Sequence, residues 1–201
     1  MELNTYPLVC TRGVVLYPNQ EIVIDVGRDT SVHAVENAQD NYDKKICLFS
    51  QKELEKENPG KEDIYPVGTL CEVRHIRRFD NFLRVKFRGI KRVKLNNWIN
   101  GSLSDLAEVE ILESEKQDAV EEEALIRMIA DELDRMQGQD RFVTKEIVME
   151  ISKGMGGEFL SDKAVQGLPL DIERKQQYLE TLGVNDRLMM LLQDMAKEKK
   201  M

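Results

Sequence analysis

Residues 74–94 read RHIRRFDNFLRVKFRGIKRVK and contain nine Lys or Arg, three Phe and one acid, Asp80. Basic residues interleaved with aromatic ones are typical of a nucleic-acid surface, where cations contact phosphates and rings stack on bases. The alternation over residues 83–87 instead predicts a β-strand with one buried and one exposed face. The segment is therefore either a nucleic-acid interface or an ordinary pair of strands.

This segment is predicted to form two strands joined by a turn. Asp80 and Asn81 are turn-forming residues that separate two segments with strand patterns. Alternate side chains of the second strand would form two faces, an apolar one of Leu83, Val85 and Phe87 and a basic one of Arg84, Lys86 and Arg88. Because stacking on a base beside its phosphate needs a ring and a cation on one face, Phe87 is expected to pack in the core.

Two parts of this predicted hairpin remain candidate binding sites. Phe79 and Phe82 flank the turn, where their rings are expected to be exposed. The basic face, Arg84, Lys86 and Arg88, is expected to be a positive patch on an acidic protein. Acidic substrates, a neighbouring acidic helical bundle or, weakly, DNA or RNA would be its partners.

Composition limits the class of protein. The chain has 201 residues, a net charge of -8 and a pI near 5.0, whereas free-standing nucleic-acid binders are usually basic. With 41% hydrophobic and 33% charged residues, it is expected to be folded and soluble. No apolar run approaches the roughly 20 residues that cross a bilayer, and no signal peptide is evident. We expect a cytoplasmic protein without membrane contact.

Signatures of catalysis and of metal binding are absent from the sequence. No GxxxxGK[ST], HExxH or GxSxG motif occurs. Cys10, Cys47 and Cys71 form no CxxC pair, so they are expected to be buried reduced thiols. His33 and His75 lie in a helical and a strand pattern, where a structural role is expected. These observations favour a binding module with no catalytic residue, metal or cofactor of its own.

The chain divides by pattern into two parts. Residues 1–112 have a net charge of -1 and residues 113–201 a net charge of -7. The first part is predicted to be a small α+β barrel or folded sheet, with strands at 22–26, 46–49, 68–73 and 83–87 and one helix at 29–39. The second part is predicted to be a helical bundle, with helices at 114–137, 142–151, 159–166 and 172–182 and a last one from Asn185.

The predicted last helix has an apolar stripe and no stop signal. The stripe consists of Leu188, Leu191, Leu192 and Met195, at the i, i+3, i+4, i+7 positions of a helix. Neither Gly nor Pro follows it before Met201. We therefore expect that the helix continues into a longer protein.

Five segments resemble, in order, the N-terminal domain of the Lon protease family. They are YPLVCTRGVVLYPN (6–19), VGRDTSVHAVENA (26–38), DIYPVGTLCEV (63–73), VKFRGIKRVKL (85–95) and LSDKAVQGLPLDIERKQQYLETLGVNDRLMMLL (160–192). The resemblance covers essentially the whole chain. Cys10 and Thr11 depart from the Pro-Leu usual in the family, Asn19 from Gly, and Gly183 from a frequent acidic residue.

The resemblance implies both a fold and a function. The fold would be a PUA-like β domain over residues 1–112, followed by a helical bundle over 113–201. The full protein would be a cytosolic, ATP-dependent serine protease that assembles as a hexamer. Its N-terminal region would capture unfolded, damaged or tagged proteins, while ATP and magnesium would bind in an ATPase part outside this chain. Whether the fragment is a monomer or a dimer is left open.

Capture of many unfolded proteins requires adaptable apolar surface, because these substrates share exposed apolar side chains and no sequence. Candidates in the first loop are Leu16, Tyr17 and Pro18, and candidates on the last helix are Met189 and Met190. The alternative is that Tyr17 and Pro18 shape a turn and that the Met residues fill gaps in the bundle. Two other functions remain open: a stand-alone partner-binding or ligand-binding protein, and a PUA-like nucleic-acid binder.

Overall fold

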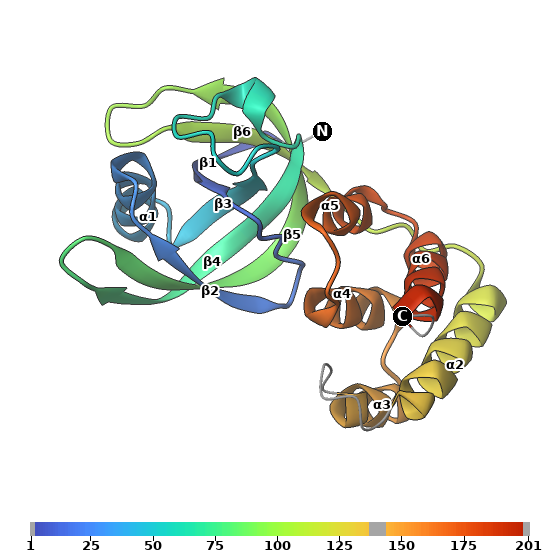
Figure 1. Ribbon diagram of the computed structural model, residues 1–201. Helices are drawn as coiled ribbons and strands as arrows, with labels where there is room; N and C mark the ends of the chain where they lie inside the picture. The colour runs from blue at the N-terminus through green and yellow to red at the C-terminus, as the bar shows by residue number, and fades with distance from the viewer. Residues whose placement is uncertain (1–2, 137–143, 199–201) are drawn as a thin grey trace. The chain divides into compact units, whose positions relative to one another are not determined.

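The computed structural model describes residues 3–136 and 144–198 of the chain (Figure 1). The chain divides into two compact units, Met1–Glu113 and Ser114–Met201. The first unit is a mixed β-sheet with one long helix, and the second unit is helical (Figure 1). The predicted fold class, a β barrel or sheet with one helix followed by helices, is confirmed.

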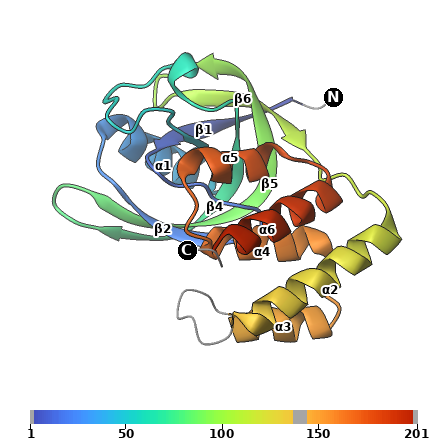
Figure 2. The same cartoon turned by 45° about the vertical axis from the view of Figure 1, so that its right-hand side comes forward.

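A six-stranded sheet forms the first unit. Its strands are β1 (Leu3–Thr11), β2 (Glu21–Val26), β3 (Lys45–Ser50), β4 (Val67–Arg78), β5 (Leu83–Ile99) and β6 (Leu106–Leu112). The sheet order is β2-β5-β4-β3-β1-β6, and the far end of β5 also pairs with β6. The long β5 strand therefore closes five strands into a barrel, with β2 added at its first half (Figure 2).

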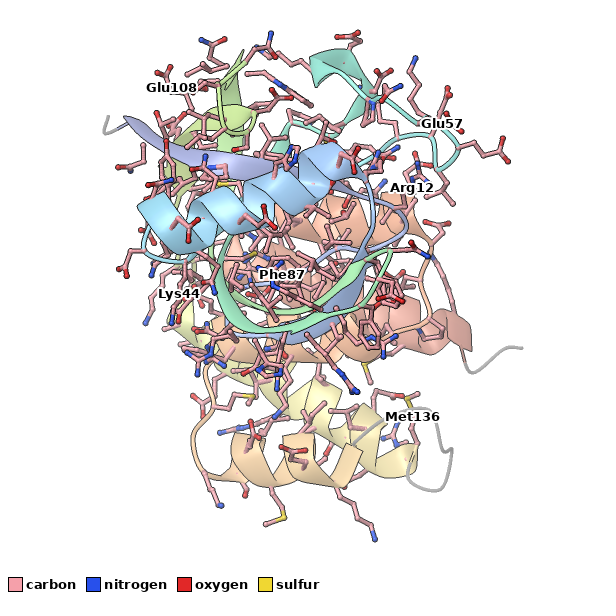
Figure 3. All side chains as sticks on the ribbon, turned by 90° about the vertical axis from the view of Figure 1, so that its left-hand side faces the viewer. Arg12, Lys44, Glu57, Phe87, Glu108 and Met136 are labelled. Carbon is pink, nitrogen blue, oxygen red and sulfur yellow. The ribbon has the colours of Figure 1, made fainter. Side chains whose placement is uncertain are left out.

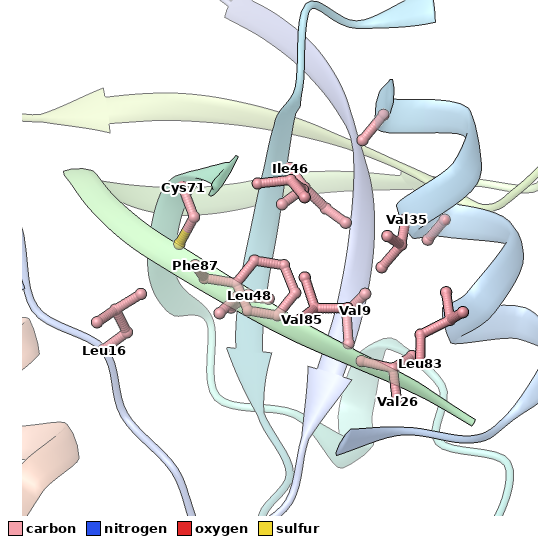
Figure 4. Close-up of a cluster of buried hydrophobic side chains, with 13 residues drawn as sticks. Val9, Leu16, Val26, Val35, Ile46, Leu48, Cys71, Leu83, Val85 and Phe87 are labelled. Atoms are coloured by element: carbon pink, nitrogen blue, oxygen red, sulfur yellow. The ribbon is translucent and has the colours of Figure 1, made fainter. Parts of the chain in front are cut away.

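The core of this unit follows the alternation predicted for β5. Leu83, Val85 and Phe87 are buried, and they join a cluster with side chains from the other strands and from α1 (Asp29–Asn41) (Figure 4). Burial of each such apolar side chain is worth about 1.5–3 kcal/mol. A second buried cluster in this unit includes Leu8, Phe49, Leu70, Val93 and Val109.

Gly89 allows the loop after β1 to cross β5. The Asn19 amide donates to the Gly89 carbonyl, and the Gly89 amide donates to the Gln20 carbonyl, each at 2.9 Å. A Cβ atom at position 89 would lie 2.2 Å from the carbonyl oxygen of Tyr17. Only glycine fits this approach, which fixes Tyr17 and Pro18 against the strand.

The described residues of the second unit form the helices α2 (Ala119–Arg135), α3 (Thr144–Ser152), α4 (Gly157–Gly167), α5 (Ile172–Glu180) and α6 (Val184–Glu198). Their buried stripes include Leu125, Ile129 and Leu133 on α2 and Leu188, Leu191 and Met195 on α6. A fully buried cation, Arg187, donates to the Ser161 hydroxyl, the Thr181 carbonyl and the Ser114 hydroxyl. The stripe predicted for the last helix is thus confirmed, except that Leu192 is only partly buried.

The ends of the helices differ from the predictions. Asp118 caps α2 by accepting from the Glu121 amide at 2.7 Å, so this helix begins five residues later than predicted. Asp171 caps α5 by accepting a hydrogen bond from the Arg174 amide at 2.8 Å. The last helix, predicted from Asn185, begins at Val184, and the Asn185 side chain donates to the Asp118 carbonyl at 2.9 Å. The first two residues of the helix predicted at 142–151 lie outside the described residues.

Candidate functional site

A stacked pair of aromatic rings lies at the tip of the β4–β5 hairpin. The Phe79 amide donates to the Phe82 carbonyl at 3.0 Å and closes a turn through Asp80 and Asn81, as predicted. This turn places the rings of Phe79 and Phe82 face to face, with centroids 4.7 Å apart and planes 12° apart. Phe79 is 36% exposed and Phe82 is half-buried. The tip thus presents an apolar, aromatic surface to solvent.

Two guanidinium groups lie over these rings. Arg77 lies 5.0 Å from the centroid of Phe79, and Arg84 lies 5.2 Å from Phe79 and 5.7 Å from Phe82. Arg77 and Arg84 face each other across the two strands. A cation over a ring is worth about 0.5–1 kcal/mol at an exposed site, so these contacts help to fix the rings in place.

The basic face of β5 is exposed, as predicted, but two acids from β2 pair with its three cations. Arg84 pairs with Asp25 at 2.8 Å, while Lys86 and Arg88 both pair with Glu21, at 3.0 and 3.1 Å. Hydrogen bonding from Arg84 lowers the pKa of Asp25, and hydrogen bonding from Lys86 lowers that of Glu21. The predicted positive patch is therefore reduced to an excess of one positive charge. Its acidic partners come from a strand that lies far from β5 in the sequence.

The first-loop candidates are in the core of the β unit. Leu16 is 2% exposed, Tyr17 is 0% exposed and Pro18 is buried. The Leu16 carbonyl also accepts a hydrogen bond from the Thr69 hydroxyl. The expectation of an exposed apolar loop is wrong, because the crossing at Gly89 holds this segment against the sheet. The alternative, that these residues shape the chain path, agrees with the structure.

The two methionine candidates differ in exposure. Met189 on α6 is 41% exposed. Met190 is half-buried, and its sulfur accepts a hydrogen bond from the Thr181 hydroxyl at 3.6 Å. Within the helical unit, Met189 therefore has accessible apolar surface, whereas Met190 has largely a packing role.

Among the described residues, neither the cysteines nor the acidic side chains form a reactive thiol or a metal-binding cluster. Cys10, Cys47 and Cys71 are buried free thiols, as predicted, and burial raises the pKa of Cys10 to about 12. The pKa of Cys47 and that of Cys71 are also raised by burial, so none of the three is a ready thiolate. Residues 3–136 and 144–198 contain no cluster of three or more His, Cys, Asp or Glu side chains that would hold a metal ion. None of the helices among them has the length and apolar character of a membrane span.

One site was missed by the sequence reasoning. A pocket of about 380 Å³ lies between β1, β2 and the first turn of α1, with Arg12 and Arg28 in its lining. Figure 3 shows Arg12 near one end of α1 and Lys44 near the other. Arg12 and Arg28 lie on either side of β2 in the sequence, and no sequence motif indicates that they line the same pocket. The one local signal is that Arg28 directly precedes a helix.

Comparison with solved structures identifies the fold. The N-terminal domain of the Lon protease of the Mycobacterium avium complex matches 96% of this chain and 98% of its own, with a TM-score of 0.79 and 18% identity. A Lon N-terminal domain protein from Xanthomonas campestris matches 94% of this chain and 97% of its own, with a TM-score of 0.64 and 17% identity. The fold is therefore that of Lon N-terminal domains.

Sequence comparison then gives the family. The model of the ATP-dependent protease La (LON) substrate-binding domain matches residues 5–197, and the chain belongs to this family. The Lon protease of Syntrophomonas wolfei is 33% identical over 201 residues, and that of Buchnera aphidicola from Acyrthosiphon pisum is 31% identical over 198 residues. Each alignment covers 98% of this chain and 25% of the relative, so the chain spans about a quarter of the length of these proteins.

Proposed function

We propose that this chain is the substrate-recognition and assembly module of an ATP-dependent serine protease that degrades misfolded, damaged and selected regulatory proteins. The module binds unfolded or tagged proteins and has no catalytic site of its own. In the full protein, which we propose to be a cytoplasmic homo-hexamer, ATP and magnesium bind in a separate ATPase part. Membership of the LON substrate-binding domain family supports this proposal.

The observation that carries the proposal is the aromatic pair at the hairpin tip. Phe79 and Phe82 are fixed by stacking on each other and by the guanidiniums of Arg77 and Arg84. A rigid aromatic surface contacts apolar side chains at little cost in conformational entropy. Cations beside the rings add attraction for acidic side chains. We infer that the tip binds exposed apolar segments with acidic neighbours.

A binding measurement with two variants tests this function. Fluorescence anisotropy of a labelled, reduced and alkylated protein that cannot refold reports its capture by the 201-residue chain. Phe79→Ser combined with Phe82→Ser is expected to weaken capture about tenfold, because each exposed aromatic contact is worth about 0.5–1.5 kcal/mol. The matched control is Leu103→Ser, which removes another exposed apolar side chain, 63% exposed, beyond the opposite end of β5. Equal capture by both variants would remove the hairpin tip from the proposal.

Nucleic-acid binding is the second candidate function, because rings and cations do share one face at the tip. Stacked aromatics beside guanidiniums are a known platform for single-stranded nucleic acid. Binding of single-stranded RNA that falls steeply between low and physiological salt would support this function. Absence of RNA binding at low salt excludes it without affecting the protein-capture proposal.

A further inference from the structure

The pocket beside α1 combines apolar side chains with two cations. Val9, Val14, Ile24 and Val26 contribute apolar surface to its lining, and Arg12 and Arg28 contribute guanidinium groups. Its volume of about 380 Å³ is within the range of small-molecule sites. A ligand that matches this lining has a negative group and an apolar group close together.

Arg28 is a partly buried cation held by neutral oxygens. It donates to the Cys10 carbonyl at 2.6 Å, the Gln51 side-chain oxygen at 2.8 Å and the Glu57 carbonyl at 3.2 Å. These bonds use three of its five N–H donors. Within the described parts of the chain, no carboxylate forms an ion pair with it. Burial lowers the pKa of Arg28, and the positive charge of Arg12 lowers it further. Both effects disfavour the charged guanidinium, so a bound anion would stabilise it.

Arg12 places a second positive charge at the same pocket. Arg12 is exposed, and it donates a long hydrogen bond, 3.4 Å, to the Lys56 carbonyl. Asp25 also lines the pocket, but Arg84 holds its carboxylate through two hydrogen bonds. Two neighbouring guanidiniums repel each other, and an anion between them relieves that repulsion and binds in a bidentate manner.

We propose that this pocket binds a carboxylate that carries a small apolar group. Arg12 and the free N–H donors of Arg28 hold the carboxylate, while Val14 and Ile24 contact the apolar group. Inorganic phosphate fits less well, because it leaves the apolar lining without a partner. A polypeptide C-terminus with an apolar last residue and a free short-chain carboxylic acid both have this chemistry. The site does not depend on the hairpin tip.

Calorimetric titration of the 201-residue chain tests the proposal. Four probes are compared: an acetylated tripeptide ending in leucine, the same peptide with a C-terminal amide, 3-methylbutanoate and inorganic phosphate. The free-acid peptide is expected to bind at least about tenfold more tightly than the amide, because hydrogen bonds from a guanidinium to a carboxylate are stronger than those to a neutral amide. Tighter binding of the peptide than of 3-methylbutanoate identifies a chain end as the ligand, and equal binding identifies a free acid.

Two variants locate the binding in the pocket. Arg12→Gln removes an exposed cation and is expected to weaken binding of the acid by about fivefold or more. Arg78→Gln is the matched control, since Arg78 is also exposed and pairs with Glu36 on α1, outside the pocket lining. Equal affinity for acid and amide, preference for phosphate, no binding of any probe, or an unchanged affinity in Arg12→Gln would each overturn the proposal.

Discussion

Arg84 lies directly opposite Asp25 across the β2–β5 pair, and its guanidinium donates to both carboxylate oxygens, at 2.8 and 3.1 Å. The same guanidinium lies over the rings of Phe79 and Phe82. One side chain therefore connects an acid on β2 to the aromatic tip of the hairpin. The ion pair neutralises the cation and also holds it beside the rings.

Reversal of the charge at position 84 is predicted to destabilise the β unit. Arg84→Glu places two carboxylates opposite each other and removes a cation from the rings, so the Tm is expected to fall. Combining it with Asp25→Arg restores an opposite-charge pair and is expected to recover most of the loss. Fluorescence of Trp98, the single tryptophan of the chain, reports unfolding of this unit alone. A double variant no more stable than Arg84→Glu would contradict this account.

Shortening the Leu16 side chain in the first loop is predicted to destabilise the β unit. Leu16→Ala removes a buried side chain from the core and is expected to cost about 2–5 kcal/mol of unfolding free energy. The control, Leu54→Ala, changes a leucine that is 50% exposed and is expected to cost less than about 0.5 kcal/mol. Urea unfolding followed by Trp98 fluorescence measures both. Similar costs at the two positions would mean that Leu16 is not a core residue.

Gly89 is predicted to be intolerant of any side chain. Gly89→Ala forces the Tyr17 carbonyl away from β5 and is expected to cost more than about 2 kcal/mol. Gly27→Ala is the matched control in the same unit, since a Cβ atom there meets its nearest neighbour at an ordinary 3.8 Å. The same urea titration distinguishes them. Equal stability of the Gly89→Ala and Gly27→Ala variants would rule out the close crossing.

Asp194 is predicted to make the helical unit sensitive to acid. Burial alone would raise its pKa, but hydrogen bonds from Arg174 at 2.8 Å and Tyr178 at 2.6 Å outweigh this and lower it. A lowered pKa contributes stability above the ordinary aspartate value of about 3.9, and that stability is lost as the pH falls through the folded-state pKa. At neutral pH, Asp194→Asn is expected to cost about 2–4 kcal/mol.

The pH dependence of the Tm distinguishes loss of the hydrogen bonds to Asp194 from the general effect of removing a negative charge. The difference in Tm between the wild type and Asp194→Asn should narrow as the pH falls from about 5 to about 2. Circular dichroism at about 222 nm, where helices dominate the signal, follows the helical unit. Asp131→Asn removes one exposed carboxylate from α2 and should show no such narrowing. A constant difference at all pH values would mean that the Asp194 carboxylate is not held by Arg174 and Tyr178.

Local patterns predicted those elements whose burial alternates regularly. Leu83, Val85 and Phe87 define the inner face of β5, and Leu188, Leu191 and Met195 define the buried stripe of α6. Strands β1 and β6 were not predicted, although Gly13 follows β1 and Asn100 and Gly101 precede β6. Their pairing with each other, and with β3 and β5, is a contact between segments distant in the sequence.

The candidate site was only partly predictable for the same reason. The turn at Asp80 and Asn81 is local, so the exposed position of Phe79 followed from it. Neutralisation of Arg84 depends on Asp25, and burial of Tyr17 depends on Gly89, and both relationships join segments that are distant in the sequence. Such contacts can be assigned only when the order of the strands in the sheet is known.

Photo-crosslinking tests the central claim, capture of unfolded protein at the hairpin tip, most directly. Benzoylphenylalanine in place of Phe79 keeps an aromatic ring at the tip, and the same residue in place of Leu103 provides the control. Irradiation with a reduced and alkylated protein is expected to give crosslinks from position 79 to apolar segments and few from position 103. Equal crosslinking from both positions, or none from position 79, would contradict the account.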